Sequence, residues 1–217
     1  MEFAVITLYF YQLMLKPLSE YKAVLFDLDG VLVDMTHGHY EALNEALGLF
    51  GYQIGEDDHI KVYNGLPTKE KLRIMSERNQ LPEALHGIIR KQKKIYTKKQ
   101  IEINCKPDYS KILLLSYLKS KKLKLACCSN AIQESVEEML EKTMLKGYFD
   151  LVLGNDVGYK PKPAPDIYLA AMKQLDLKPS ECLIVEDAEH GVKAALASGG
   201  EVIRVKGFKD VDLNLFS

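Results

Sequence analysis

Short apolar runs that alternate with helix-periodic segments are the feature that most constrains the fold of this 217-residue chain. The runs indicate strands, because each is bounded by polar or glycine-containing turns. They lie at residues 23–26, 123–128, 151–153, 182–185 and 202–205. Apolar residues at three- and four-residue spacing indicate helices at 132–140, 165–175 and 191–197. Strands that alternate with helices form parallel sheets, so the second half of the chain predicts successive βα units.

The segment between the first two predicted strands has a different pattern. From residue 34 to about 109 only helical spacing occurs, at 40–50, 68–78 and 82–100. A helical insert directly after the first strand would lie over the carboxyl edge of the sheet, on two connections that can hinge. We therefore predict an α/β core made of residues 1–33 and 110–217, and a separate all-helical module made of residues 34–109.

The charge balance is typical of a globular chain and excludes several classes of partner. There are 29 basic and 30 acidic side chains, so no net charge favours nucleic acid or an anionic membrane surface. The basic run at residues 91–99 suits a solvated helix face. The apolar stretch at residues 3–15 is shorter than the roughly 20 residues that cross a bilayer and lacks the basic start of a signal peptide. An edge strand, a docking helix and a non-native extension all stay open for it.

The four cysteines indicate reduced thiols rather than a disulfide framework. None of them has C-x-x-C spacing, and Cys127 and Cys128 lie in an apolar run, where they point to opposite faces of a strand. Such thiols fit the cytoplasm, which is the location that we expect. The sequence gives no indication of an oligomeric state, because apolar patterns that build an interface also build a core.

Two carboxylates, one residue apart, follow the first predicted strand. Asp27 and Asp29 are followed by Gly30, which allows the chain to turn sharply. A strand end of this kind lies at the carboxyl edge of a parallel sheet, where α/β folds bind ligands. Surface turns also hold paired aspartates, but two unpaired carboxylates at the end of a buried strand are costly unless a cation neutralises them. The pair therefore predicts a metal ion.

Three further segments carry matching chemistry. Ser129 and Asn130 follow the second predicted strand, where the hydroxyl and nearby N–H groups suit a phosphate, although Ser129 alone also suits a helix N-cap. Lys162 stands among three prolines that hold one cation rigidly beside a helix start. Glu186 and Asp187 end a later strand and supply hard oxygen ligands suited to Mg²⁺.

Together these four segments resemble the haloacid dehalogenase superfamily of phosphohydrolases, in the branch with a helical cap inserted after the first strand. The motifs DLDGVLVD, CSNA, KPAPD and VEDAEHG occur in the family's order and extend over most of the chain from about residue 21. The resemblance implies an α/β fold, with a Rossmann-like doubly wound parallel sheet as its core. It also implies that a mobile all-helical cap closes over a site at the carboxyl ends of the strands.

The resemblance also implies a role for each motif residue. Asp27 would be the nucleophile that forms an aspartyl-phosphate, and Asp29 would protonate the leaving oxygen and then deprotonate water. Mg²⁺ would be held by the Asp27 carboxylate, the Asp29 backbone carbonyl and Asp187, with Glu186 in support. The phosphate binders would be Ser129, Asn130 and Lys162. Ala188 departs from the family, in which a serine usually follows the Glu-Asp pair, but this removes no metal ligand.

We therefore expect a Mg²⁺-dependent phosphatase for a small phosphorylated metabolite, such as a sugar phosphate or a nucleotide. Asp29 argues against dehalogenation, because the dehalogenating members lack the second acid. A β-phosphoglucomutase is the alternative, since His39 resembles the cap-linker histidine of that enzyme. Thr68, however, stands where the mutase carries an arginine for a second phosphate, which favours the phosphatase. His39, Thr68 and Lys69 are the cap residues that we expect to contact substrate.

Two other classes receive less support from the sequence. Phosphonate-cleaving members of the family use a cap lysine to form an imine with substrate, and this cap contains many lysines, including Lys69 and Lys71. No pattern marks one of them as buried. A protein that binds a phosphorylated ligand or a partner without turnover is the non-enzymatic alternative. The intact acid pair argues against it, because a pure binder does not need an acid two residues from a nucleophile.

Overall fold

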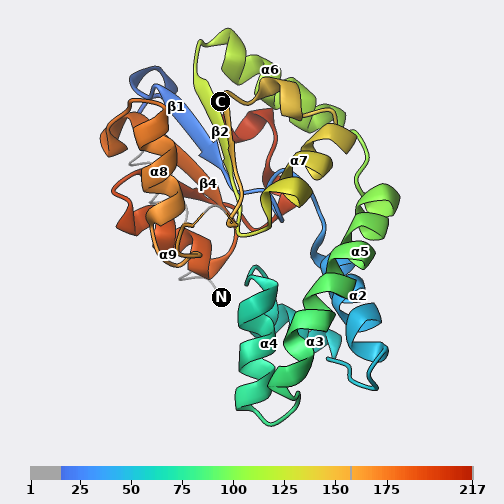
Figure 1. Cartoon of the computed structure of the whole chain (residues 1–217). Coiled ribbons are helices and arrows are strands. Elements are labelled where there is room, and N and C mark those ends of the chain that lie inside the picture. The colour runs from blue at the N-terminus through green and yellow to red at the C-terminus, as the bar shows by residue number, and fades with distance from the viewer. Residues whose placement is uncertain (1–15, 157, 217) are drawn as a thin grey trace, which may run out of the picture.

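The strands form one five-stranded parallel sheet, in the order β3-β2-β1-β4-β5 (Figure 1). The computed structural model describes residues 16–156 and 158–216, so the alternatives for residues 3–15 lie outside the described residues. Each strand begins and ends within one residue of its prediction. The bounds are β1 (Ala23–Phe26), β2 (Lys124–Cys128), β3 (Leu151–Leu153), β4 (Cys182–Glu186) and β5 (Glu201–Arg204).

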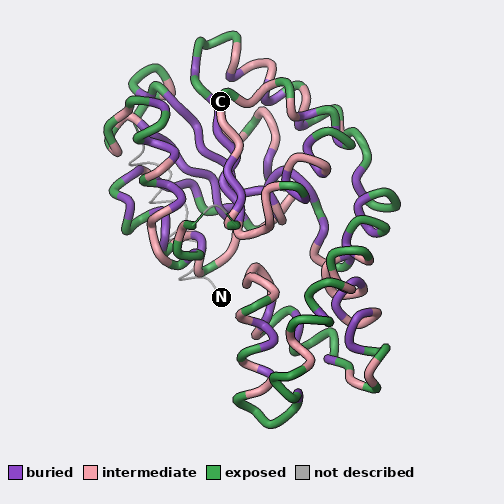
Figure 2. The backbone as a smooth tube through the Cα atoms, viewed as in Figure 1, coloured by how far each residue is buried: buried purple, intermediate pink, exposed green. Residues whose placement is uncertain are grey.

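Strand β1 lies at the centre of the sheet because both of its faces are apolar. Val24 and Phe26 pack with the layer that contains α6 (Tyr109–Ser120) and α7 (Gln133–Lys142). Ala23 and Leu25 point the other way, into the layer of α8 (Asp166–Gln174) and α9 (Glu189–Ala197). Helices therefore cover both faces, and Figure 2 shows the strands as the buried centre of this part of the molecule. The predicted doubly wound α/β core is confirmed.

The insert between β1 and β2 is helical and has its own apolar cluster. Its helices are α2 (Thr36–Gly48), α3 (Glu56–Asp58), the π-helical stretch η2 (His59–Tyr63), α4 (Thr68–Glu77) and α5 (His86–Asn104). Leu43, Leu47, Leu72 and Ile89 belong to this cluster, which is separate from the two clusters that flank the sheet. Figure 1 shows these helices beyond the carboxyl ends of the strands. The helical cap is confirmed, while its boundaries at residues 33/34 and 109/110 stay a prediction.

Helix α6 is the main element that the sequence analysis did not predict. Asp108 is its N-cap, and the carboxylate accepts hydrogen bonds from the backbone N–H groups of Ser110 at 2.8 Å and Lys111 at 3.3 Å. An aspartate before an apolar segment is a recognised start of a helix, so the sequence contained this signal. Short 3₁₀ turns occur at Leu18–Glu20, Glu83–Leu85, Lys146–Tyr148, Pro179–Glu181, Phe208–Asp210 and Leu213–Phe216.

Two further expectations concern the cysteines and the membrane. All four cysteines are free and buried, as predicted for core thiols. Across residues 16–156 and 158–216, no helix has both the length and the apolar character that a bilayer crossing requires.

Candidate active site

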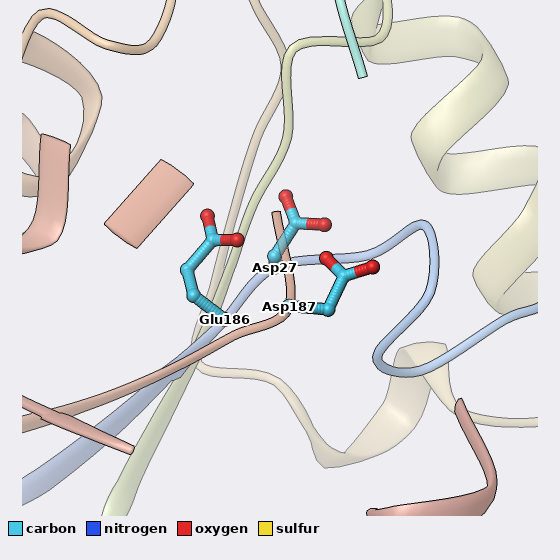
Figure 3. Close-up of side chains that lie close together, drawn as sticks. All are labelled: Asp27, Glu186 and Asp187. Carbon is cyan, nitrogen blue, oxygen red and sulfur yellow. The ribbon is translucent and has the colours of Figure 1, made fainter. Parts of the chain in front are cut away.

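Three carboxylates from β1 and β4 converge at the carboxyl edge of the sheet, with Asp27 between Glu186 and Asp187 in Figure 3. The two strands are parallel neighbours, and Phe26 pairs with Val185, so both chains leave the sheet side by side. The strand order reverses at this point of the sheet. Strands β2 and β3 lie on one side of β1, whereas β4 and β5 lie on its other side. Open α/β sheets bind ligands at such a switch point.

This carboxylate group has the chemistry of a Mg²⁺ site. Ligand oxygens of Asp27, Glu186 and Asp187 lie within 4.8 Å of one another, and hard oxygens are the ligands that Mg²⁺ prefers. Burial, with the charge of Glu186 in addition, raises the pKa of Asp187 to about 6. Oδ1 of Asp187 is buried and has no hydrogen-bond partner within the described part of the chain. A divalent cation would compensate both the excess negative charge and the missing partner.

Lys162 holds two of these acids together. Its Nζ donates to Oδ1 of Asp27 at 2.6 Å, to Oε1 of Glu186 at 2.6 Å and to the carbonyl oxygen of Cys128 at 2.8 Å. These three bonds use all three N–H groups of the ammonium. Burial alone lowers the pKa of Lys162, but the attraction of Asp27 and Glu186 outweighs it, and the pKa lies above its usual range. The side chain is 1% exposed, so the structure presents a charged and fully bonded lysine.

Asp27 titrates abnormally in the same environment. Burial raises its pKa well above the ordinary range, although Lys162 opposes this effect. The neighbouring charges of Glu186 and Asp187 raise the pKa further. One lysine thus does not fully balance three acids, which again favours a bound cation at this edge.

The carboxylates of Glu186 and Asp187 differ in how many hydrogen bonds the protein makes to them. Oε1 of Glu186 accepts from Lys162 and also from the hydroxyl of Tyr168, at 2.5 Å. The Glu186 carboxylate lies against Gly191, where an added Cβ would lie only 2.1 Å from Oε1. Glu186 is therefore held by the protein, whereas Asp187, with its unpartnered oxygen, has more freedom to bind a metal ion.

Asp29 does not belong to the carboxylate group, since its side chain contacts the cap instead. Oδ2 of Asp29 lies 3.2 Å from Nε2 of His39, and Nδ1 of His39 lies 3.5 Å from Nζ of Lys93. A lysine ammonium only donates, so Nδ1 accepts and Nε2–H donates to Asp29. Burial raises the pKa of Asp29, but the contact with His39 and the charges of Lys93 and Lys71 together outweigh burial, and the net shift is downward. The predicted metal contact through the Asp29 backbone carbonyl stays a prediction.

Ser129 and Asn130 lie beside Lys162, as expected for one site. Ser129 is buried, and its hydroxyl accepts from the N–H of Ala131 at 3.1 Å. Helix α7 begins four residues later, so Ser129 is not its N-cap. The Asn130 amide accepts from the Lys162 N–H at 2.9 Å and donates to the carbonyl of Gly65 at 3.1 Å. Asn130 therefore aligns the lysine loop and contacts the cap, and phosphate binding by both residues stays a prediction.

The three cap residues proposed as substrate contacts occupy different environments. His39 contacts Asp29, Thr68 begins α4 and is partly buried, and Lys69 is exposed. Lys71, which the sequence did not mark as buried, is 4% exposed. It follows Thr68 by three residues and so lies on the same face of the helix. The three-residue spacing from Thr68 could therefore have indicated that Lys71 is a candidate site residue.

The cap also contacts the core through Gly65. Its φ is +71°, and an added Cβ would lie 2.1 Å from Cε1 of His190 on α9. This close approach and the bond from Asn130 together bring the loop before α4 against the core. Gly30, in the turn after β1, also has a close neighbour. Its φ is +84°, and an added Cβ would lie 2.1 Å from Oδ2 of Asp187. Both positions therefore require glycine.

A doubly wound core with acids at its switch point, under a helical cap, defines a capped α/β hydrolase of the phosphoryl-transfer type. Comparison with known families makes this specific. The family described as "Haloacid dehalogenase-like hydrolase" matches residues 24–205, and the chain belongs to this family. The predicted resemblance is thus confirmed, as is the prediction of an enzyme of this hydrolase class.

Individual relatives cover most of the chain. A "Phosphorylated carbohydrates phosphatase" of Thermotoga maritima is 31% identical over 190 residues, which cover 84% of this chain and 83% of the relative. A "Phosphoglycolate phosphatase" of Aquifex aeolicus is 32% identical over 181 residues, 82% of this chain and 81% of the relative. Among solved structures, a β-phosphoglucomutase from Clostridium difficile matches with a TM-score of 0.77 and 23% identity, covering 91% of this chain and 93% of that one. That last likeness shows the fold alone.

Proposed function

We propose that this protein is a Mg²⁺-dependent phosphatase that hydrolyses a small phosphorylated metabolite, a sugar phosphate or a nucleotide, through a phosphoryl group on Asp27. The observation that carries the proposal is the arrangement around Lys162, whose ammonium lies 2.6 Å from both Asp27 and Glu186. Relatives that are 31% and 32% identical and are named as phosphatases add support. We further propose that residues 34–109 act as the moving cap, that the enzyme works in the cytoplasm, and that it uses no nucleic acid or membrane.

The carboxylates of Asp27 and Asp187 would hold the Mg²⁺, with the Asp29 backbone carbonyl and Glu186 in support. When bound, the ion supplies positive charge that offsets the repulsion between a carboxylate nucleophile and a phosphate dianion. Lys162 adds a second positive charge at Asp27. Ser129 would contact the phosphate oxygens, and Lys162 would exchange one of its three present hydrogen bonds for a phosphate oxygen. Asn130 would keep the lysine loop in register.

The first step transfers the phosphoryl group to the protein. A carboxylate oxygen of Asp27 forms a bond to phosphorus, and the bond from phosphorus to the leaving oxygen breaks. The leaving oxygen takes a proton from Asp29 and departs as an alcohol. General acid assistance of this kind contributes about 10²- to 10⁴-fold, so positioning and electrostatic stabilisation must provide the remainder.

The second step returns Asp27 to its starting state. Asp29, now a carboxylate, removes a proton from a water molecule, whose oxygen bonds to phosphorus. The bond from phosphorus to Asp27 breaks, and inorganic phosphate leaves. His39 donates to Asp29 and would favour its ionised form, which the general base of this second step requires, whereas the first step requires Asp29 in its protonated form. Lys93 would orient the His39 ring for this contact.

A phosphate-release assay tests the proposal. Wild-type protein should release phosphate from a panel of sugar phosphates and nucleotides with Mg²⁺ and not with a chelator, and Asp27→Asn should abolish release. Asp34→Asn, at an exposed acid in the same motif, serves as the control and should retain turnover. Full activity in Asp27→Asn would refute the nucleophile.

The contact of His39 with Asp29 keeps the phosphomutase as a second candidate, because the mutase resemblance predicted a histidine at this linker. Glucose 1-phosphate primed with a glucose bisphosphate separates the two functions. A phosphatase should release phosphate faster than it isomerises the sugar phosphate, and the reverse order would favour the mutase.

A further inference from the structure

A group of basic side chains lies on the cap side of Asp29 and contains no acid. Lys71, Lys93 and His59 form this group, which we call the cap cation cluster, and His39 connects it to Asp29. The charge of Asp29 acts on both lysines and raises their pKa values, while burial lowers them more strongly. Asp29 alone therefore does not compensate the cluster.

Lys71 is the least satisfied member of the cluster. It is buried, yet its Nζ makes neither a hydrogen bond nor an ion pair with any residue in the described ranges. Burial, with a further contribution from Lys93, lowers the pKa of Lys71 to about 7. A buried ammonium with three unused donors is costly to the fold. Such a group persists where a ligand supplies the missing acceptors.

His59 shows the same deficit at a second position. It is 1% exposed, and neither ring nitrogen has a hydrogen-bond partner in the part of the chain that the structure describes. Its ring packs against Tyr40, with the centroids 5.4 Å apart. Burial lowers the pKa of His59 to about 4, and the charge of Lys71 lowers it further. The cap therefore buries two polar side chains, Lys71 and His59, that lack hydrogen-bond partners within the described residues.

The cluster lies at the interface between cap and core. The charge of Lys71 acts on Asp29 and on His190, which are both core residues. His190 contacts the cap at Gly65. Lys93 reaches Asp29 through His39, and Lys71 lies on α4 directly after the Gly65 loop that contacts the core, so the cluster lies on the side of the cap that is turned to Asp29.

We propose that the cap cation cluster binds a second anionic group of the substrate, so that preferred substrates carry a phosphate ester at one end and a carboxylate or second phosphate at the other. The inference rests on the proposed function. An anion would supply acceptors for Nζ of Lys71 and for an N–H of His59, whereas a neutral leaving group would leave these donors buried and unpaired. Charged hydrogen bonds of this kind strongly distinguish substrates with and without the acceptor.

The location also explains how a second anion could be bound without an arginine at position 68. Thr68 removes the contact that the mutase resemblance led us to expect. Lys71 lies one turn further along α4, on the same helix face, and provides a cation there. A lysine ammonium is a compact point charge, so it accommodates either a carboxylate or a phosphate.

Two matched pairs of probes test the inference. 3-Phosphoglycerate and glycerol 3-phosphate differ in a carboxylate against a hydroxymethyl group, and fructose 1,6-bisphosphate and fructose 1-phosphate differ in a second phosphate. In at least one pair, the anion-bearing member should have a kcat/KM about tenfold higher or more. Lys71→Met should reduce this ratio to within about threefold, and Lys71→Arg should retain it. Lys91→Met, at an exposed lysine of the same cap, should leave it unchanged.

Thermal shift on Asp27→Asn measures binding without turnover, so the inference is tested even if no ester is hydrolysed. The anion-bearing probe should raise Tm more than its partner, and Lys71→Met should remove the difference. Lys93→Met, at a half-buried position, is a second variant if Lys71→Met does not fold.

Equal kcat/KM values and equal Tm shifts within both probe pairs in the wild type would overturn the inference, as would a preference for the anion-bearing probe that survives both lysine variants. If glycerol 3-phosphate is hydrolysed without any such preference, the proposed function stands and only the inference fails.

Discussion

At the scale of single residues, Lys162 determines how the acids of the site are arranged. It bonds Asp27 from β1 and Glu186 from β4, and its backbone N–H is fixed by Asn130. One buried ammonium thus joins two neighbouring strand ends. Its removal would leave two buried carboxylates without their cation, which is more damaging than the loss of a surface ion pair.

Lys162→Met should therefore lose stability as well as activity. We expect the free energy of unfolding to fall by about 3–5 kcal/mol, the usual cost of breaking a buried ion pair, and turnover to be lost. Urea denaturation monitored by circular dichroism measures the first effect. Lys160→Met, at an exposed lysine two residues earlier, is the control and should behave like wild type. A stable and active Lys162→Met would show that the ammonium is dispensable.

His59 should make stability depend on pH in a defined window. Its pKa is lowered from 6.5 to about 4 in the folded protein, so between these values the unfolded chain binds a proton that the folded chain does not. Stability should thus be full above pH 6.5 and fall as the pH decreases towards 4, by up to roughly 3 kcal/mol. His59→Phe should flatten the curve in this window. The exposed His37 provides the control, His37→Phe, which should leave the slope unaltered; an unaltered slope in His59→Phe would contradict the assignment.

At the scale of elements, the turn after β1 brings together the carboxylates that we propose as metal ligands. Gly30 approaches Asp187 so closely that a methyl group would overlap its carboxylate. The turn thereby places the end of β1 directly beside the start of the loop after β4. The prediction of a sharp turn at Gly30, directly after Asp27 and Asp29, agrees with this backbone.

Gly30→Ala should disturb metal binding more than folding. At φ +84° the alanine is strained by about 1–3 kcal/mol, and its Cβ displaces the Asp187 side chain. We expect the Mg²⁺ concentration for half-maximal phosphate release to rise at least about tenfold. Gly48→Ala, where a Cβ has open space, should leave the Mg²⁺ dependence unchanged. A normal Mg²⁺ dependence in Gly30→Ala would show that Asp187 is not a ligand.

The elements that the sequence predicted well are those whose burial is complete. β1 and β4 are buried on both faces, so they appear as continuous apolar runs between polar turns. The buried face of helix α6, formed by Lys111, Leu114, Leu115 and Leu118, has helical spacing. The helix was missed because the exposed Leu113 joins its apolar residues into one continuous run. Its N-cap at Asp108 carried the better information. Local capping chemistry can therefore indicate a helix where apolar spacing does not.

At the scale of the whole molecule, ion pairs such as Lys94–Glu134 join the cap to the core away from the site, and three further contacts join them at the carboxyl edge of the sheet. His39 bonds Asp29, Asn130 bonds the carbonyl of Gly65, and His190 packs against the same glycine. They come from separate parts of the chain, so the cap contacts the carboxyl edge of the sheet at several points in this structure. Closure of this kind excludes water and completes the site.

Gly65→Ala should hinder this closure. The methyl group would overlap the ring of His190, and φ is already positive at this position. We expect kcat/KM to fall by about tenfold or more, with only a small change in Tm, because the apolar cluster of the cap and the two clusters that flank the sheet remain intact. The double variant Gly65→Ala/His190→Ala should recover part of the loss in a phosphate-release assay. If the single variant is fully active, contact at this position is not needed for turnover.

The motif residues of the site were predictable from sequence, but its cap side was not. Asp27, Glu186 and Asp187 each follow a recognisable strand, and parallel strands bring their ends together. Lys71 and His59 have no such pattern, since their burial arises from packing among cap helices and from the approach of the cap to the core. The spacing of residues within one cap helix does not predict which of them will be buried by other cap helices or by the core.

The most direct test of the account is to identify the residue that accepts the phosphoryl group. Wild-type protein is mixed with a hydrolysed ester and Mg²⁺, quenched in acid during turnover, and analysed by peptide mass spectrometry. The account predicts one phosphoryl group on Asp27, dependent on Mg²⁺ and absent from Asp27→Asn. A phosphoryl group on another residue, or continued turnover with no modified Asp27 peptide, would contradict it.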